Sequence, residues 1–219
     1  MKYWVKTHSI VKKLLSSYIW DIPNDENKIY LTFDDGPTPE ITEWVLDQLA
    51  KHNAKATFFC IGQNIVDNPT IFKKLLDNGH AIGNHTFDHP NGWQTKTQDY
   101  LENISLCQEA IQNQNASTKL FRPPYGKLKP SQLKSIKQQG FQIIMWDVLS
   151  ADFDTSISPE KCLKNVIPNI RSGSIIIFHD SEKAFKNLEY TLPKVLDYID
   201  EKNFSYDIIN SNTIAKSVK

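Results

Sequence analysis

The chain has 219 residues, 40% of them hydrophobic and 23% charged, with 25 basic and 25 acidic side chains that give a formal net charge of zero. This length suits one sizeable globular domain. The balanced charge, without a basic stripe that carries interleaved aromatics, excludes the usual signature of nucleic-acid binding. No run of eighteen apolar residues exists, so no transmembrane segment is predicted.

Residues 1–24 are basic but lack a continuous apolar stretch and a small-residue cleavage site, so they make a poor signal peptide and a cytoplasmic location is the default expectation. Apolar residues at helical spacing predict a short amphipathic helix packed on the domain, with attachment to a membrane surface as the alternative. Its apolar residues are Ile10, Val11, Leu14, Leu15 and Tyr18, and Lys2, Lys6, Lys12 and Lys13 are interpreted as a solvated face.

Apolar periodicity along the rest of the chain predicts strands that alternate with helices. The strands are expected near 29–33, 56–60, 80–84, 119–121, 141–146, 174–178 and 204–209. The helices are expected near 39–52, from 68, 95–114, 130–139, from 158 and 188–202, with Thr38 as the N-cap of the first and Pro168 bending the fifth. This alternation indicates a parallel sheet, either open or closed into a barrel.

Polar side chains follow one predicted strand after another. Asp34 and Asp35 follow the first strand, His85 the third, Arg122 the fourth, residues 147–154 the fifth and His179 the sixth. The carboxyl ends of the strands in a parallel barrel open on one face, where such enzymes have their active sites. The recurrence therefore favours a single-domain α/β fold with a parallel barrel of (β/α)7 type.

The stretch T-F-D-D-G-P, residues 32–37, places two adjacent carboxylates where a buried strand ends. H-T-F-D-H, residues 85–89, carries His85 and His89 at i and i+4, a spacing that puts both imidazoles on one side. Two imidazoles and one carboxylate form a three-ligand site that leaves a position open for water, as in catalytic zinc centres. One aspartate would then hold the cation while the other handles a proton.

Arg122 in R-P-P-Y-G, residues 122–126, can pair with the free carboxylate and keep it ionised, although an ordinary surface salt bridge is the alternative. His179 ends an apolar strand, where proton donation competes with a buried structural role. His8, His52 and His80 are assigned no function. The three cysteines, Cys60, Cys107 and Cys162, have no C-x-x-C spacing and are interpreted as small buried residues that favour a reducing compartment.

Five motifs together resemble the polysaccharide deacetylases, the NodB-type fold of carbohydrate esterase family 4. In order they are T-F-D-D-G-P, H-T-F-D-H, R-P-P-Y-G, W-D-V-L-S-A-D-F (146–153) and F-H-D (178–180), and they span about two-thirds of the chain. The resemblance implies a distorted (β/α) barrel with a catalytic domain over 25–215. It also implies a divalent metal, usually zinc with cobalt or nickel as alternatives, bound by Asp35, His85 and His89.

The same resemblance implies the remaining roles. Asp34 is expected to be the catalytic base and His179 the catalytic acid; Arg122 orients the base, Asp152 tunes the acid, and the Tyr125 N–H stabilises the oxyanion. Two positions depart from the family pattern, because Leu149 and Phe153 stand where many members have Asp and Trp, which implies an altered groove shape. Many relatives are exported with a leader, so the family leaves the cell envelope open as a location.

The predicted reaction is hydrolysis of N-acetyl groups on N-acetylglucosamine-containing glycans, such as chitin oligomers or peptidoglycan, with release of acetate. An amine is a poor leaving group without an acid, so His179 favours amide over ester chemistry. The alternatives are an O-acetyl esterase acting on xylan-like glycans, a non-catalytic glycan-binding module and a metal-free amidohydrolase. Trp93, Tyr125 and Trp146 are candidates for stacking on sugar rings, and the sequence leaves the oligomeric state open, with a monomer compatible.

Overall fold

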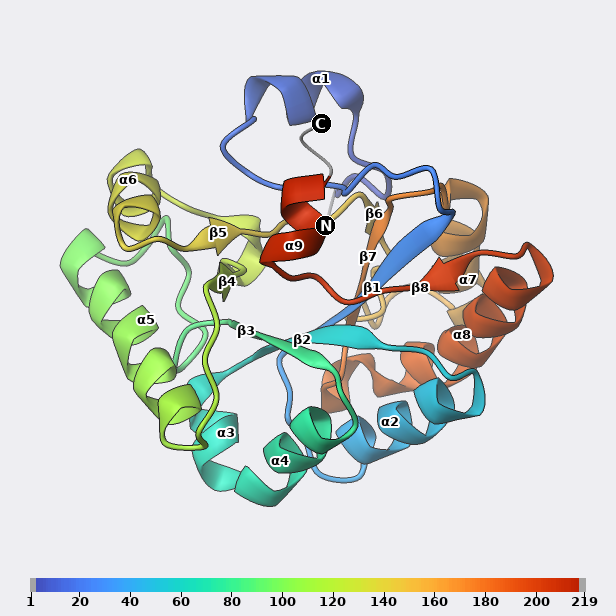
Figure 1. Cartoon of the computed structure of the whole chain (residues 1–219), viewed down its shortest axis with the longest axis horizontal. Coiled ribbons are helices and arrows are strands. Elements are labelled where there is room, and N and C mark those ends of the chain that lie inside the picture. The colour runs from blue at the N-terminus through green and yellow to red at the C-terminus, as the bar shows by residue number, and fades with distance from the viewer. Residues whose placement is uncertain (1–2, 217–219) are drawn as a thin grey trace.

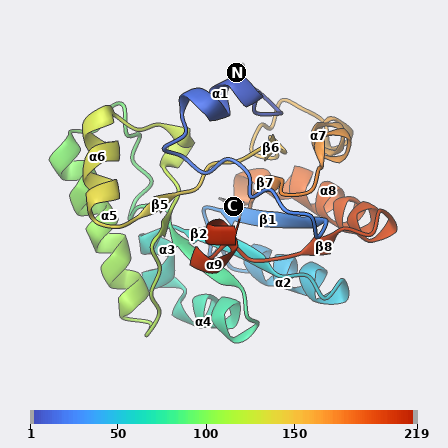
Figure 2. The ribbon, with the colours of Figure 1, turned by 45° about the horizontal axis from the view of Figure 1, so that its top comes forward.

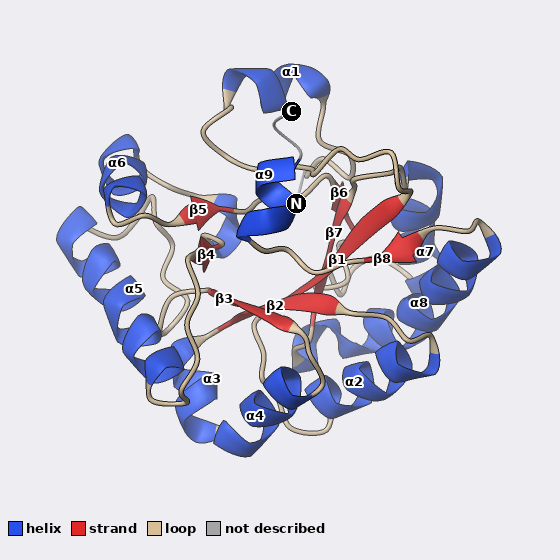
Figure 3. Ribbon diagram, viewed as in Figure 1, coloured by secondary structure: helices blue, strands red, loops and turns tan. Residues whose placement is uncertain are grey.

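The computed structural model describes residues 3–216, and within them eight strands form one parallel sheet that curls into a half-barrel (Figures 1 and 3). The strand order is β5-β4-β3-β2-β1-β7-β6, with β8 paired to β1. The strands are β1 Lys28–Asp34, β2 Ala56–Cys60, β3 Ala81–Asn84, β4 Leu120–Phe121, β5 Gln142–Ile143, β6 Val148–Leu149, β7 Ile175–His179 and β8 Ser205–Tyr206. The expected single-domain α/β fold with a distorted parallel barrel is confirmed, and the barrel is open between β5 and β6, which do not pair.

Most of the helices surround the outer face of this sheet, whereas the first and the last lie over and within its opening (Figure 2). The helices are α1 Ser9–Leu14, α2 Ile41–Lys51, α3 Gly62–Asp67, α4 Pro69–Asp77, α5 Thr97–Gln112, α6 Pro130–Gln138, α7 Pro159–Val166, α8 Glu182–Glu201 and α9 Ser211–Lys216. The apolar faces of the long helices meet strand side chains such as Phe33 and Phe178 in the largest core cluster. No helix among the described residues is long and apolar enough to cross a membrane.

A second core fills the inside of the half-barrel. Tyr30, Phe59 and Ile175 point inward from strands, and Ile209 and Ile214 reach them from the C-terminal segment that holds α9. Alternate residues of β1 therefore meet two different apolar layers, which explains why all but its first residue are buried. Burial on both faces fixes the register of β1 and with it the direction in which Asp34 points.

The N-terminal segment closes the gap between β5 and β6, where the sheet edges do not pair. The Ile19 N–H donates to the carbonyl of Ile143 at 2.8 Å, and the Thr7 N–H donates to the carbonyl of Asp147 at 2.9 Å. Lys6 and Lys12 both form ion pairs with buried Asp147. The interpretation of these two lysines as a solvated face was therefore wrong; Lys2 lies outside the described residues.

The predicted N-terminal helix forms as α1, but its apolar side chains do not pack inward. None of its residues is buried, and Ile10 and Leu14 are 69% and 78% exposed. The segment is held instead by backbone bridges and by the lysine contacts to Asp147. The expectation of an apolar packing face was wrong because helical spacing indicates only which side chains share a face, not whether anything covers that face.

Several local predictions differ from the structure. Glu40, not Thr38, is the N-cap of α2, and the Thr38 N–H instead donates to the Thr42 hydroxyl. The fifth strand is only β5, much shorter than 141–146, because Trp146 and Asp147 turn toward the N-terminal segment. Helices α3 and α9 and strand β6 were not predicted, since each is too short to display a period.

Candidate metal and catalytic site

Polar side chains gather at the carboxyl ends of the central strands. Asp34 ends β1 and lies in register with His179 at the end of β7, while Asn84 at the end of β3 pairs with Phe121 of β4. Because all these strands are parallel, the residues that follow them enter the same region from different elements. The sequence-based expectation that distant motifs converge here is borne out in the geometry.

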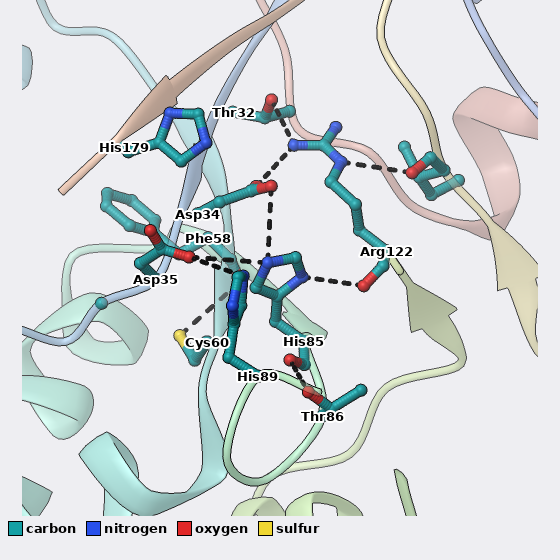
Figure 4. Close-up of polar contacts among 12 residues, drawn as sticks. Thr32, Asp34, Asp35, Phe58, Cys60, His85, Thr86, His89, Arg122 and His179 are labelled. Atoms are coloured by element: carbon teal, nitrogen blue, oxygen red, sulfur yellow. Dashed lines mark hydrogen bonds and ion pairs between the residues drawn. The ribbon is translucent and has the colours of Figure 1, made fainter. Parts of the chain in front are cut away.

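Asp35, His85 and His89 form a cluster in which one donor atom from each lies within 4.8 Å of the others (Figure 4). The Asp35 Oδ1 atom is 3.6 Å from His85 Nε2 and 3.4 Å from His89 Nε2. These separations exceed normal hydrogen bonds, and the buried Oδ1 atom has no hydrogen-bond partner among the described residues. An orphaned carboxylate oxygen facing two imidazole nitrogens fits a divalent cation, so the residues present suit the implied metal.

The imidazoles are prepared for metal binding. His85 Nδ1 lies 2.7 Å from the Arg122 carbonyl oxygen, to which it donates when protonated, so the Nε2 lone pair faces Asp35. Burial lowers the pKa of His85 well below its ordinary value, with a contribution from His89, and burial also lowers the pKa of His89. Both rings are therefore held in the neutral form that binds a metal.

The loops that carry the cluster are held in uncommon backbone conformations. Asp35, Thr86 and His89 have φ angles of 83°, 67° and 62°, in the left-handed region that non-glycine residues seldom adopt. The Asn103 side-chain oxygen accepts from the Phe87 N–H at 2.6 Å and so holds the loop between the two histidines. Such strain indicates that the surrounding contacts fix these positions.

Asp34 is 2% exposed and binds the guanidinium of Arg122, with Oδ1 2.6 Å from Nη1. Burial raises the pKa of Asp34 to about 6, although the Arg122 charge opposes this rise. Arg122 itself has no exposed surface; it also donates to the Thr32 hydroxyl and to the carbonyls of Ile144 and Met145. The guanidinium therefore fixes the Asp34 carboxylate beside the metal cluster, where its other oxygen lies 3.8 Å from His85.

His179 lies across the two aspartates from His85 and His89 (Figure 4). Its Nδ1 atom is 2.8 Å from Asp152 Oδ1, and the backbone N–H of His179 donates to the other Asp152 oxygen at 2.7 Å. Burial lowers the pKa of His179, but the Asp152 carboxylate outweighs it and raises the pKa to about 9. The Asp152 carboxylate thus favours the protonated form of His179.

Aromatic rings border both sides of the site. Tyr125 is 59% exposed with a φ of 59°, and its ring lies 4.7 Å from that of His89. On the opposite side the Phe153 ring lies 5.1 Å from that of His179. Trp146 is half-buried among core residues and packs near Gly126, so it is less available to a ligand than Trp93, which is 61% exposed.

Two supporting residues were not predicted. Asp180 is buried and accepts hydrogen bonds from the Gly36 N–H and the Thr42 hydroxyl, which ties the turn after Asp35 to the start of α2. Burial raises the pKa of Asp180 to about 8. Asp180 belongs to the motif F-H-D, but the motif does not reveal that this carboxylate faces Gly36. Thr32, which accepts from Arg122, opens the motif T-F-D-D-G-P, but the motif does not reveal that its hydroxyl faces the guanidinium.

A curled parallel sheet that presents two histidines and a carboxylate at the ends of its strands is the arrangement expected of metal-dependent hydrolases. The family model "Polysaccharide deacetylase" matches residues 21–144. The chain belongs to the polysaccharide deacetylase family.

Named proteins of this kind are similar over most of the chain. A peptidoglycan-N-acetylglucosamine deacetylase of Bacillus cereus is 37% identical over 75% of this chain and 60% of its own length. A chitooligosaccharide deacetylase of Azorhizobium caulinodans is 36% identical over 73% of this chain and 76% of its own. The crystal structure of the Bc1960 peptidoglycan N-acetylglucosamine deacetylase superimposes with a TM-score of 0.83 at 33% identity, covering 88% of this chain and 91% of that one. The chain thus spans about three-fifths of the first relative.

Proposed function

We propose that the protein hydrolyses N-acetyl groups of N-acetylglucosamine-containing glycans and releases acetate. The observation that carries this proposal is the convergence of three units at one site: the Asp35 cluster, the Asp34–Arg122 pair and the Asp152–His179 pair. A hydrolase of an amide needs an activated water, a base and an acid, and these units supply one group for each need. The names of the related deacetylases support the same substrate class.

Asp35, His85 and His89 are the proposed metal ligands. Two neutral imidazoles and one carboxylate suit Zn²⁺, with Co²⁺ or Ni²⁺ as alternatives. When bound, such an ion polarises the acetyl carbonyl and makes water more acidic.

Asp34 is the proposed base. Its carboxylate is buried beside the cluster and fixed by Arg122, and its pKa of about 6 leaves it ionised at neutral pH yet basic enough to take a proton from the attacking water. Arg122 orients the carboxylate without competing for the proton, because a guanidinium is already fully protonated and has no lone pair to accept one. Asp34 then holds this proton while the acetyl carbon becomes tetrahedral.

His179 is the proposed acid. Asp152 keeps the imidazole protonated and holds Nδ1, which leaves Nε2 to give its proton to the leaving amine. The Tyr125 N–H is the proposed donor to the developing oxyanion, a contact worth on the order of 3 kcal/mol when well placed. Its backbone is held in the left-handed region next to His89, on the side of the cluster where the acetyl group would lie.

The test is acetate release by the zinc-loaded protein from N-acetylglucosamine oligomers, peptidoglycan glycan strands and acetylated xylan. We expect acetate from the first two and much less from the third. Release from xylan alone would replace the proposal with O-acetyl esterase activity. Binding of the oligomers without acetate release from any of the three would indicate a non-catalytic glycan-binding module.

A further inference from the structure

Two lysines border the site on opposite sides. Lys127 Nζ lies 5.1 Å from the centre of the Trp93 ring and 5.8 Å from that of Tyr125. Lys183 Nζ lies 5.9 Å from the centre of the Phe153 ring. None of the ion pairs found among residues 3–216 involves either lysine, so each ammonium group is available to an anion.

The first lysine belongs to a surface that the fold holds in place. The Trp93 indole N–H donates to the Leu128 carbonyl at 3.2 Å, so the ring is oriented although it is 61% exposed. The loop that carries Trp93 lies directly on the Lys127 backbone, where a side chain at Gly92 would meet the Lys127 carbonyl at 2.2 Å. An exposed indole whose orientation is fixed by a hydrogen bond presents an apolar ring face to solvent. Such a face can stack on a sugar ring, because the C–H groups of the sugar also form an apolar face while its hydroxyls point outward.

The two lysines flank the cluster from opposite directions. Lys127 lies on the side of the proposed metal ligands, because it faces the Tyr125 ring and this ring lies against His89. Lys183 lies on the side of the proposed acid, because it faces the Phe153 ring and this ring lies against His179. His89 and His179 stand on either side of the aspartates (Figure 4). A glycan chain whose reacting sugar sits over the aspartates would therefore extend toward one lysine in each direction.

We propose, on the basis of the function proposed above, that Lys127 and Lys183 select a glycan in which both sugars next to the reacting N-acetylglucosamine carry a carboxylate. A polymer that alternates N-acetylglucosamine with a carboxylate-bearing sugar, such as N-acetylmuramic acid, places one anion on each side of every reacting sugar. A neutral N-acetylglucosamine oligomer offers none. The aromatic rings accept either polymer, whereas the lysines distinguish them by charge.

The test compares kcat/KM for three substrates: peptide-free alternating glycan strands, the same strands with their carboxylates converted to carboxamides, and neutral N-acetylglucosamine oligomers. We expect the wild-type protein to prefer the carboxylate over the carboxamide strands by about tenfold at low salt, about threefold from each lysine, the size of an exposed ion pair. Lys127→Met and Lys183→Met should each reduce the preference about threefold, and the double variant should abolish it. Because neutral oligomers carry no anion, each variant should change their rate less than the rate on the carboxylate strands.

Lys134→Met is the matched control, because Lys134 is exposed on α6 and has no ion pair among the described residues. It should keep the full preference. A wild-type protein that treats carboxylate and carboxamide strands alike, or a double variant that keeps the preference, would overturn the inference. Glycan strands that still carry their stem peptides are a fourth substrate. If the preference appeared only with these strands, the lysines would recognise a peptide carboxylate, and the proposed recognition of a sugar carboxylate would be refuted.

Failure of the proposed function would show itself separately, as absence of acetate from every substrate, neutral oligomers included. In that event calorimetric binding of the same strands to the wild-type protein decides the inference. Tighter binding of carboxylate than of carboxamide strands, lost in the double lysine variant, supports it; equal binding refutes it.

Discussion

Arg122 is the largest side chain among the fully buried residues, and its contacts join Asp34 to the inside of the half-barrel. Replacement by Met would leave Asp34 and two backbone carbonyls without their donor. We expect Arg122→Met to lower the free energy of unfolding by about 3–5 kcal/mol, the cost of an uncompensated buried charge, and to reduce acetate release. Denaturant titration measures the first effect.

The chain offers one other arginine as a control, Arg171, whose guanidinium donates to carbonyls near the surface. Arg171→Met should change stability by less than about 1 kcal/mol. An equal loss from the two variants would contradict the role given to Arg122.

Asp152 permits a sharper test of the acid. Asp152→Asn removes the charge that keeps His179 protonated, while the amide keeps much of the shape. Turnover of an N-acetyl substrate should fall roughly 100-fold, and hydrolysis of an activated acetate ester should fall far less, since its leaving group needs no acid. The control is Asp154→Asn, which should keep the wild-type rate on both substrates. Asp154 lies two residues away and accepts hydrogen bonds from the hydroxyls of Tyr3 and Ser156. Parallel losses on amide and ester would refute the assignment of His179.

The residues to which the sequence assigns catalytic or metal-binding roles lie at or beside the cluster. They were predictable because they belong to short polar motifs that follow strands, and the strands of a parallel sheet end on the same face. The contacts of Thr32 and Asp180 were not predictable in this way. Each acts through a partner about 90 to 144 residues away in sequence, and one sequence without its fold does not indicate such pairs.

At the scale of elements, the turn after β1 depends on Gly36. A Cβ at Gly36 would lie 2.0 Å from Asp180 Oδ2, so Gly36→Ala forces the turn after Asp35 and the Asp180 carboxylate apart. We expect a loss of stability of about 2–3 kcal/mol and weaker metal binding. Gly140→Ala is the comparison, since Gly140 has a φ of +82° but open space around it and should cost only about 1 kcal/mol. Calorimetry of both variants decides the matter, and equal costs would contradict the proposed packing.

The N-terminal segment gives a prediction with a defined pH dependence. Burial raises the pKa of Asp147, but hydrogen bonds from Lys12, Lys6 and Ser174 outweigh it and hold the pKa below its ordinary value. A carboxyl whose folded pKa is depressed stabilises the fold above its unfolded pKa of about 3.9, and this stability is lost as the pH falls through the folded pKa.

Asp147→Asn should therefore lower the melting temperature between pH 5 and 8, by an amount equivalent to about 2 kcal/mol, and the difference from wild type should shrink below about pH 4. Asp77→Asn removes an exposed pair with Lys73 and should change little at any pH. If the difference in melting temperature between wild type and Asp147→Asn grew as the pH fell, the predicted direction of the pH dependence would be wrong.

Long elements with a clear apolar face were predicted well, as in α5, which agrees closely with the predicted 95–114. Helices α3 and α9 and strand β6 were not predicted, because their conformation is imposed by neighbours rather than by their own sequence. The exposed apolar face of α1 belongs to the same class: the pattern predicts the helix, and only the surrounding fold decides what covers it.

At the scale of the whole molecule, a parallel half-barrel brings together residues that lie up to 145 positions apart, from Asp34 to His179, at one set of strand ends. Alternation of strands and helices predicts this architecture, and recurrent polar residues after the strands predict which end is functional. The closing of the sheet gap by residues 5–19 was not predictable, because isolated backbone bridges leave no periodic trace.

The central claim is that Asp35, His85 and His89 hold one metal ion while Asp34 moves the proton. The most direct measurement is metal content by elemental analysis together with acetate release from N-acetylglucosamine oligomers, for wild type, His85→Ala and Asp34→Asn after loading with zinc. We expect one zinc and full activity for wild type, little zinc and no activity for His85→Ala, and one zinc with at least about a 100-fold loss of rate for Asp34→Asn. Full zinc in His85→Ala, or an undiminished rate in Asp34→Asn, would contradict it.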